Sequence, residues 1–355
     1  MTHRLDPLAR PEPEPPCASR NYADRFPALP FRRWQGQHVS TVGLGPCRER
    51  GHDHAASMLA AVAAGCNVLD MAPHPDQDGY ERCLGEAIRS AAGQGIGARA
   101  ALAINATVGL VSDLMVHTIR RHGFARLKHL VEQRYVRPGL FGWHELAASC
   151  YTLSPGYLRY SIEQTLARAG LDYLDCVFVD HPEIHRRTAS PAEFHRRLVA
   201  AFATLEQLCC EGTIRGYGIA SPEPVALDEL LALARTAAGG APRLSALRVP
   251  YSLLRPEMWP LVKEASARGL HVFATGCLDG GTPQYQIPDE LDEQLGELND
   301  PAIAIRWVQS APGVGTAVFG SRDRRHIRAN LAAARLPRLP SALYRAAHPE
   351  EEAAA

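Results

Sequence analysis

The sequence predicts an α/β fold of the (β/α)8 TIM-barrel type, and three observations carry this prediction. Eight short apolar runs typical of β-strands recur along the chain, with amphipathic helical patterns between them. Most connections between these segments are short. Several strands are apolar throughout, as a parallel sheet covered on both faces requires. Because barrels of this type carry their active sites at the carboxyl ends of the strands, the pattern also predicts where chemistry would take place.

Periodicity and end signals predict the elements in order. Asp53 and Gly65 bound the first helix of the repeat, and Ser154 followed by Pro155 marks a helix start after the third strand. The predicted strands lie at 40–44, 67–72, 100–108, 173–180, 214–219, 246–250, 271–275 and 315–319. The predicted helices include 53–65, 79–91, one starting at 154, 190–211, 301–310 and 324–334.

Segments at both ends complete the predicted domain organisation. Residues 1–30 hold seven prolines and no apolar periodicity, which predicts an extended arm outside the fold. The stretch FRRWQGQHVS at 31–40 predicts a β-hairpin that turns at Gly36 and plugs the bottom of the barrel. The barrel is predicted to span 31–338, and a C-terminal helix and tail to follow at 339–355.

A long insertion rich in His and Arg, residues 109–150, interrupts the repeat after the third strand. Because it follows the carboxyl end of a strand, we expect it to hang over that face of the barrel. Loops of this length inside a compact domain are usually lids or binding loops. The insertion and the stretch 276–298 are therefore the predicted determinants of substrate choice.

Composition excludes several function classes. Hydrophobic residues make up 46% and charged residues 21% of the 355-residue chain, as in globular proteins. The formal net charge of zero gives no electrostatic case for binding nucleic acid or a membrane surface. The nine cysteines form no CxxC motif, and no apolar signal segment opens the chain, which predicts a soluble cytoplasmic protein with reduced thiols. No spacing of His, Cys or acidic residues predicts a metal site, and nothing in the sequence predicts an oligomeric state.

Three stretches of the chain, between about residues 40 and 335, resemble the aldo-keto reductases. The first is AAGCNVLDMAPH followed by ERCLGEAI, and the second is SIEQTLARAGLDYLDCVFVDHPE followed by EGTIRGYGIAS. The third is GVGTAVFGSRDRRHIRANL, at the last strand and its helix. The resemblance implies reduction of a carbonyl by NADP(H). In that family a tyrosine protonates the substrate oxygen, helped by a lysine and an aspartate, and a histidine orients the carbonyl.

Carried over position by position, the family's four catalytic residues are mostly replaced. The aspartate is retained as Asp70. The positions of the tyrosine, the lysine and the histidine hold Pro75 preceded by His74, Thr107, and Asp180 followed by His181. The chain has only two lysines, Lys128 and Lys263, and neither ends a predicted strand. Ordinary Tyr/Lys/His carbonyl reduction is therefore predicted to be lost or altered.

The residues at these strand ends suggest a different acid–base apparatus. Asp70, His74, Asp180 and His181 are the predicted catalytic residues, because a His beside a carboxylate works as an acid–base pair near neutral pH. Tyr80 is a second candidate proton donor, near the start of the helix after the second strand. Such a group could also serve proton abstraction, dehydration, cyclisation or isomerisation without hydride transfer.

The predicted cofactor site lies after the last strand. Gly320, Ser321 and Arg322 open a helix, whose N-terminal N–H groups attract phosphate, and Arg322 suits a ribose 2′-phosphate, which favours NADP over NAD. The resemblance adds Asn330 on the adenosine side. At the nicotinamide end it points to Ser221 and to Arg248, which stands where the family has a carboxamide-binding Gln.

Three functional hypotheses follow for this chain. The first is an aldo-keto reductase-like enzyme that binds NADP(H) and acts on a small molecule, expected to be a specialised metabolite. The second is a non-redox lyase, cyclase or isomerase on the same barrel. The third is a non-catalytic scaffold that retains the barrel only.

Overall fold

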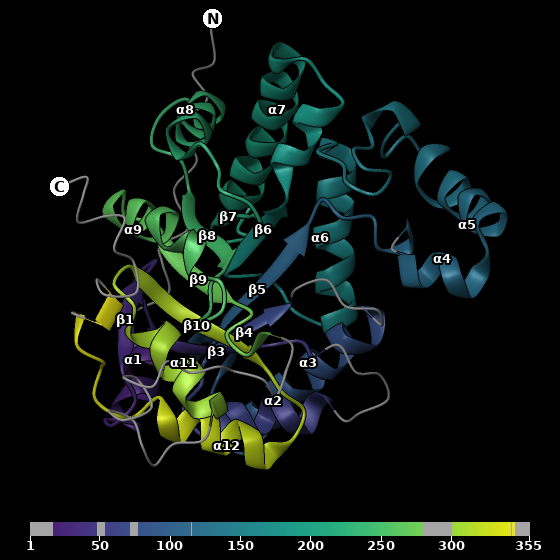
Figure 1. Ribbon diagram of the computed structural model, residues 1–355. Coiled ribbons are helices and arrows are strands. Elements are labelled where there is room, and N and C mark those ends of the chain that lie inside the picture. Colours follow the sequence, from purple (N-terminus) through teal and green to yellow (C-terminus); the bar gives the residue numbers. More distant parts are fainter. Residues whose placement is uncertain are drawn as a thin grey trace, which may run out of the picture.

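The chain folds into a closed parallel barrel that matches the predicted class (Figure 1). The computed structural model describes residues 17–47, 54–71, 77–114, 116–279, 300–341 and 343–344. The barrel strands, each paired in parallel with its neighbours, are β3 (Val42–Gly45), β4 (Val68–Met71), β5 (Ala103–Val108), β6 (Cys176–Asp180), β7 (Tyr217–Ala220), β8 (Leu244–Pro250), β9 (His271–Thr275) and β10 (Val314–Gly320). Each of the eight predicted strands is confirmed, with ends that shift by a few residues.

Helices surround the barrel and bury one face each against the strands (Figure 1). Ser154 occupies the N-cap position of its helix, Pro155 the first turn, and Gly170 ends the helix in a left-handed conformation, as the sequence signals predict. The helices of the repeat are α2 (His54–Ala63), α3 (Gln77–Gly93), α6 (Pro155–Ala169), α7 (Pro191–Cys210), α8 (Leu227–Ala238), α9 (Trp259–Ala267), α11 (Asp300–Ser310) and α12 (Arg324–Ala333). In the described part of the chain, no helix has the length and apolar character needed to cross a membrane.

The predicted hairpin is confirmed and closes the amino-terminal end of the barrel. Strands β1 (Phe31–Trp34) and β2 (Gln37–Ser40) pair in antiparallel register. The two residues between them, Gln35 and Gly36, both have positive φ, which suits a tight two-residue turn. The Trp34 ring meets Phe273 edge-on at 5.1 Å, and its Nε1 donates a hydrogen bond to the carbonyl of Ser245 at 3.3 Å.

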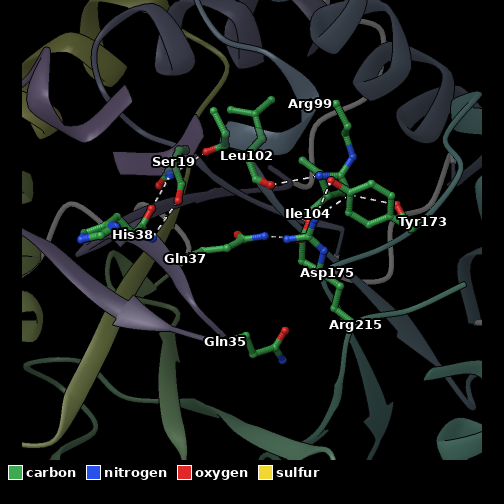
Figure 2. A network of polar contacts seen from close by, with 12 residues as sticks. Ser19, Gln35, Gln37, His38, Arg99, Leu102, Ile104, Tyr173, Asp175 and Arg215 are labelled. Carbon is green, nitrogen blue, oxygen red and sulfur yellow. Dashed lines mark hydrogen bonds and ion pairs between the residues drawn. The ribbon is translucent and has the colours of Figure 1, made fainter. Parts of the chain in front are cut away.

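A polar network beneath the barrel ties the hairpin to the strands (Figure 2). Asp175, which is 1% exposed, accepts hydrogen bonds from Gln37 Nε2 and from the Ile104 amide, both at 2.8 Å. It also pairs with Arg99 at 2.9 Å. A buried carboxylate is tolerated here because several donors satisfy it. The network holds the closed end of the barrel in one arrangement.

The prediction for residues 1–30 is wrong for the part that the structure describes. Residues Cys17–Asp24 form helix α1, and Tyr22 and Leu29 are each only 2% exposed. The Tyr22 hydroxyl donates to the carbonyl of Val62. Apolar side chains at these positions outweigh the proline-rich composition, because they pack against the barrel helices. Residues 1–16 lie outside the described residues.

The C-terminal region is described only in part. Two residues of the predicted helix and tail at 339–355 are buried. Leu339 is 6% exposed, and Tyr344 is fully buried and donates a hydrogen bond from its hydroxyl to the Trp307 carbonyl. Residues 342 and 345–355 lie outside the described residues, so the tail remains a prediction.

The insertion forms a small unit of its own. It contains α4 (Val116–His122), α5 (Phe124–Val131) and a π-helical turn at Glu132–Val136, and its separate apolar core packs against Tyr157 of α6. A bridge between Leu110 and Tyr151 joins the two ends of the insertion just after the end of β5. The helices α4 and α5 project beyond α6 (Figure 1), and a lid over the mouth stays a prediction.

We expect Trp34→Ala to lower the free energy of unfolding by about 3–5 kcal/mol, because it leaves a cavity where the hairpin packs into the closed end of the barrel. The matched control is Trp143→Ala, whose side chain is 36% exposed and whose loss should cost less than about 1 kcal/mol. Urea denaturation followed by circular dichroism measures both. Equal losses in the two variants would contradict a structural role for the hairpin.

Candidate active site

A buried ion pair lies at the centre of the barrel mouth. Asp70 on β4 is 1% exposed and Arg248 on β8 is 6% exposed. The Nη1 atom of Arg248 lies 3.2 Å and 3.3 Å from the two carboxylate oxygens of Asp70. Burial raises the pKa of Asp70, and the guanidinium opposes that rise. The retained aspartate thus has a cationic partner, supplied by β8 rather than by the lysine position on β5.

The alternation of side chains along the strands explains why Arg248 points inward. Residues two apart on a strand share one face, and Ala246, two positions earlier, lines the barrel interior. The guanidinium lies over the Phe178 ring at 4.8 Å. Gly218 on the neighbouring strand leaves room for that ring, because a Cβ there would lie 2.6 Å from it. A cation can therefore be buried on an aromatic platform.

Asp180 shares the same cation. It ends β6, and its Oδ1 lies 4.0 Å from Nη2 of Arg248. Burial raises its pKa to about 6, and Asp70 adds to the rise while Arg248 opposes it. One guanidinium thus faces two carboxylates, and Asp180 is the one that is partly open to solvent, at 18% of its side chain.

His181 is held in a strained backbone conformation beside Asp180. It has φ +46°, in the left-handed region, and its amide donates to the Ala220 carbonyl at 2.7 Å. Its Nε2 atom is buried and lies 3.4 Å from Oε1 of Glu183 without hydrogen-bonding to it. Burial lowers the pKa of His181, so the imidazole is neutral at pH 7.

Glu183 is a site residue that the sequence analysis missed. The Ser221 hydroxyl donates to its Oε1, while its Oε2 is buried and has no hydrogen-bond partner. Burial raises its pKa to about 7. The only sequence signal was its place three residues beyond the end of a strand, in DHPE. Its contact with Ser221 depends on the parallel pairing of β6 and β7.

Two more polar groups at the mouth were missed. Tyr151, at the end of the insertion, is half-buried and meets the His181 ring edge-on at 5.6 Å. Burial and the charge of Asp180 raise its pKa to about 12. Asn105 on β5 is fully buried, pairs in register with Asp70, and neither atom of its amide has a partner. Orphaned amide atoms of this kind are available to a ligand or a water.

Two predicted positions near Asp70 are placed differently. Tyr80, on the first turn of α3, is 3% exposed, and burial together with the Asp70 charge holds its pKa well above its usual value. A phenol therefore does stand in the field of Asp70, although deeply buried. Thr107, at the lysine position, donates to the carbonyl of Met71 at 3.3 Å. His74 lies outside the described residues and remains a prediction.

The predicted phosphate site has an open, basic surface. Gly320 ends β10, and a Cβ there would lie 2.6 Å from the Pro46 carbonyl oxygen, so only glycine fits. Ser321 is half-buried and Arg322 is exposed, just before α12. Asp323 caps α12 by accepting from the Arg325 amide at 2.7 Å, and it occupies part of the N-terminus that a phosphate would use. The buried Asn330, 3% exposed, lies further along α12.

The predicted nicotinamide residues are already engaged with other side chains. The Ser221 hydroxyl lies within hydrogen-bonding distance of the Glu183 carboxylate and the Glu223 carbonyl. Arg248 is committed to Asp70. The chain's residues therefore fit the phosphate end of a dinucleotide, while the nicotinamide end requires a different set of contacts.

Comparison with known proteins identifies the family. Residues 50–346 match the profile of the Aldo/keto reductase family. The chain belongs to this family. It is 24% identical over 328 residues to the uncharacterized oxidoreductase YqkF of Bacillus subtilis (strain 168), covering 85% of this chain and 89% of that protein. It is 31% identical to a D-threo-aldose 1-dehydrogenase of Pseudomonas sp over 191 residues, 46% of this chain and 53% of that protein.

Solved structures show the same fold. An aldo/keto reductase from Klebsiella pneumoniae in complex with NADP and acetate superposes with a TM-score of 0.61 at 19% identity, covering 90% of this chain and 95% of that one. The holo form of an aldo-keto reductase from Bacillus halodurans gives 0.60 at 20% identity, covering 89% and 94%. Within the described residues of this family member, no group of three or more His, Cys, Asp or Glu could hold a metal ion.

We expect Arg248→Met to destabilise the protein by about 3–5 kcal/mol at pH 8, because it leaves Asp70 buried without a cation. The double variant Asp70→Asn with Arg248→Met should recover much of that loss, since the remaining group is neutral. Chemical denaturation of the wild type, both single variants and the double variant measures the coupling. Additive losses would show that the two side chains do not depend on each other.

Proposed function

We propose that this protein is an NADP(H)-binding oxidoreductase of the aldo/keto reductase family that acts on a small molecule, with its proton chemistry moved to Asp180, His181 and Glu183. The observation that carries this proposal is the Asp70–Arg248 pair. The family's buried aspartate keeps a cation beside it although the lysine is absent. A buried pair is costly to maintain without a purpose, and strand ends at this face of a barrel favour a catalytic one.

The phosphate end supports cofactor binding. Ser321, Arg322 and the exposed Arg324 and Arg325 stand at the start of α12, with Asp323 as the acidic residue of this segment. Arginine forks bind phosphate well, and the extra 2′-phosphate of NADP(H) adds to that attraction. The Klebsiella pneumoniae and Bacillus halodurans relatives, crystallised with NADP or in a holo form, are in keeping with this assignment. NADPH, when bound, supplies a hydride.

The two carboxyl groups at the mouth divide the acid–base work. The pKa of Glu183, about 7, leaves it about half protonated at neutral pH, whereas Asp180, with a pKa of about 6, is mostly ionised. Paired groups whose environments separate their pKa values take opposite roles as acid and base. Glu183 is therefore the proposed acid. The neutral imidazole of His181, 3.4 Å from Glu183, is placed to pass a proton toward the mouth.

The acid acts on an oxygen of the substrate. Oε2 of Glu183 has no partner in the protein, so its proton is not already committed to another side chain. The Tyr151 ring meets the His181 ring at 5.6 Å, and the charge of Asp180 acts on the Tyr151 phenol, so both groups are close enough to His181 to orient the substrate. The soluble, cytoplasmic location and the specialised nature of the metabolite remain predictions of the sequence.

A non-redox reaction is the second candidate, and one observation favours it. Ser221 and Arg248, which the family resemblance assigns to the nicotinamide end, are engaged with Glu183 and Asp70. With these contacts in place, the acid–base group would serve a lyase, cyclase or isomerase without a dinucleotide. A non-catalytic scaffold is the remaining alternative.

Cofactor binding is tested by energy transfer from tryptophan to NADPH. We expect saturable binding, and we expect Arg322→Ala to weaken NADPH by roughly tenfold while changing NADH affinity little, because only NADPH carries the 2′-phosphate. Arg235→Ala, an exposed arginine on α8, is the control. Absence of any signal at about millimolar NADPH would eliminate the redox proposal and leave the non-redox candidates.

The pH dependence of turnover tests the acid–base assignment. Activity should fall above about pH 7, as Glu183 loses its proton, and below about pH 6, as Asp180 gains one. Glu183→Gln should lower kcat by about 10²–10⁴-fold. Glu163→Gln is the matched control, since that carboxylate is 54% exposed on α6 and lies 3.9 Å from Arg159. An unchanged profile in Glu183→Gln would refute the role of Glu183.

A further inference from the structure

The insertion concentrates positive charge on one part of the chain. Residues 116–137 contain six Lys and Arg and a single acidic residue, Glu132. The whole chain has 38 basic and 38 acidic residues, so the remainder carries five more acidic than basic residues. The net charge of zero therefore conceals a separation of charge, with the cations gathered on the unit that projects beyond α6 (Figure 1).

The acidic groups of the insertion are already engaged. Asp113 accepts from Arg134 and from the Tyr135 hydroxyl. Glu132 accepts from the Trp143 indole at 2.6 Å, and Glu145 accepts from the Gly142 amide at 2.7 Å. Among the described residues, no acidic partner lies against three exposed arginines, which are Arg120, Arg121 and Arg126.

The insertion presents these cations on a supported surface. Leu127 and Val131 of α5 are buried in the insertion's own core, together with Tyr135 and with Tyr157 of α6. The apolar face of α5 is therefore already used, and the face that remains carries the exposed Arg126, Lys128 and His129. We call Arg120, Arg121, Arg126, Lys128 and His129 the basic face.

Exposed apolar side chains border the basic face. Phe124 is 63% exposed, Leu130 is 45% exposed and Trp143 is 36% exposed. Outside the insertion, only two other large apolar side chains are exposed among the described residues. Lys128 Nζ lies 5.8 Å from the centre of the Trp143 ring. Arginine and aromatic residues are enriched at protein interfaces and often carry most of their binding energy.

We propose that the basic face is a docking surface for an acidic segment of another protein. Charge complementarity selects an acidic partner, and Phe124, Leu130 and Trp143 would contact apolar residues within it. A membrane fits less well, because Leu127 and Val131 are buried in the core of the insertion, and the two apolar side chains that α5 leaves exposed, Phe124 and Leu130, do not form the continuous apolar face with which an amphipathic helix enters lipid. The net negative remainder of the chain would also be repelled by a membrane plane or a long nucleic acid. The partner would dock on the helices that project beyond α6 (Figure 1), and Tyr151 at the base of the insertion contacts the His181 ring.

The test uses a fluorescein-labelled peptide of glutamates interspersed with leucine and phenylalanine, and follows its anisotropy. We expect the wild-type chain to bind it at about 50 mM salt and several-fold more weakly at about 200 mM. The triple variant Arg120→Glu, Arg121→Glu and Arg126→Glu should lose at least about tenfold in affinity. The control, Arg20→Glu, Arg82→Glu and Arg235→Glu, makes the same change of net charge at exposed positions elsewhere and should bind within about twofold of the wild type.

Circular dichroism and thermal unfolding establish that both triple variants are folded before binding is compared. Three outcomes of the binding measurements overturn the proposal. They are equal losses in the two variants, absence of wild-type binding at about 100 µM peptide, and tighter binding to a single-stranded RNA or to phosphatidylserine vesicles than to the peptide. Analytical ultracentrifugation of the wild type over a range of concentrations detects self-association. A second copy of the chain on the basic face would also contradict a separate acidic partner.

Discussion

The mouth of this barrel depends on one buried cation, Arg248. A guanidinium at this depth is stable only because Asp70 accepts from it and because the Phe178 ring supports it from below. Phe178 in turn packs edge-on against Phe273, and Phe273 against Trp34 of the hairpin plug. A continuous aromatic column thus runs from the closed end of the barrel to the ion pair, and the hairpin far from the mouth contributes to the position of the cation.

One cation among several carboxylates determines the chemistry that the mouth can support. Arg248 compensates Asp70 most closely, and Asp180 only at 4.0 Å, while Glu183 has a serine hydroxyl as its donor. Burial without full compensation raises the pKa of Asp180 and of Glu183 into the range where each can exchange protons near neutral pH. A barrel that lacks the family's lysine therefore still holds groups suited to acid–base catalysis, at neighbouring strand ends and with different side chains.

Local sequence pattern was sufficient to predict the barrel, but it did not predict the contacts between residues that are distant in the chain. The strands, the hairpin and the place of Asp70 and Asp180 at strand ends follow from local sequence pattern, which depends only on near neighbours in sequence. The helix at Cys17–Asp24 was not predicted, because proline-rich composition obscured side chains that gain stability only by packing on the barrel. The contact of Glu183 with Ser221 was missed for a similar reason, since Ser221 follows the neighbouring strand of the sheet.

By itself, the sequence determined that this is a (β/α)8 barrel of the aldo/keto reductase family, which residues stand at its strand ends, and that no lysine is among them. Only the tertiary structure decided what those residues meet. Arg248 lies 178 positions from Asp70 in the chain, and their contact exists because the barrel closes and brings β8 and β4 to face each other across its interior. The charge that a buried carboxyl carries depends on such long-range neighbours, and no local pattern encodes them.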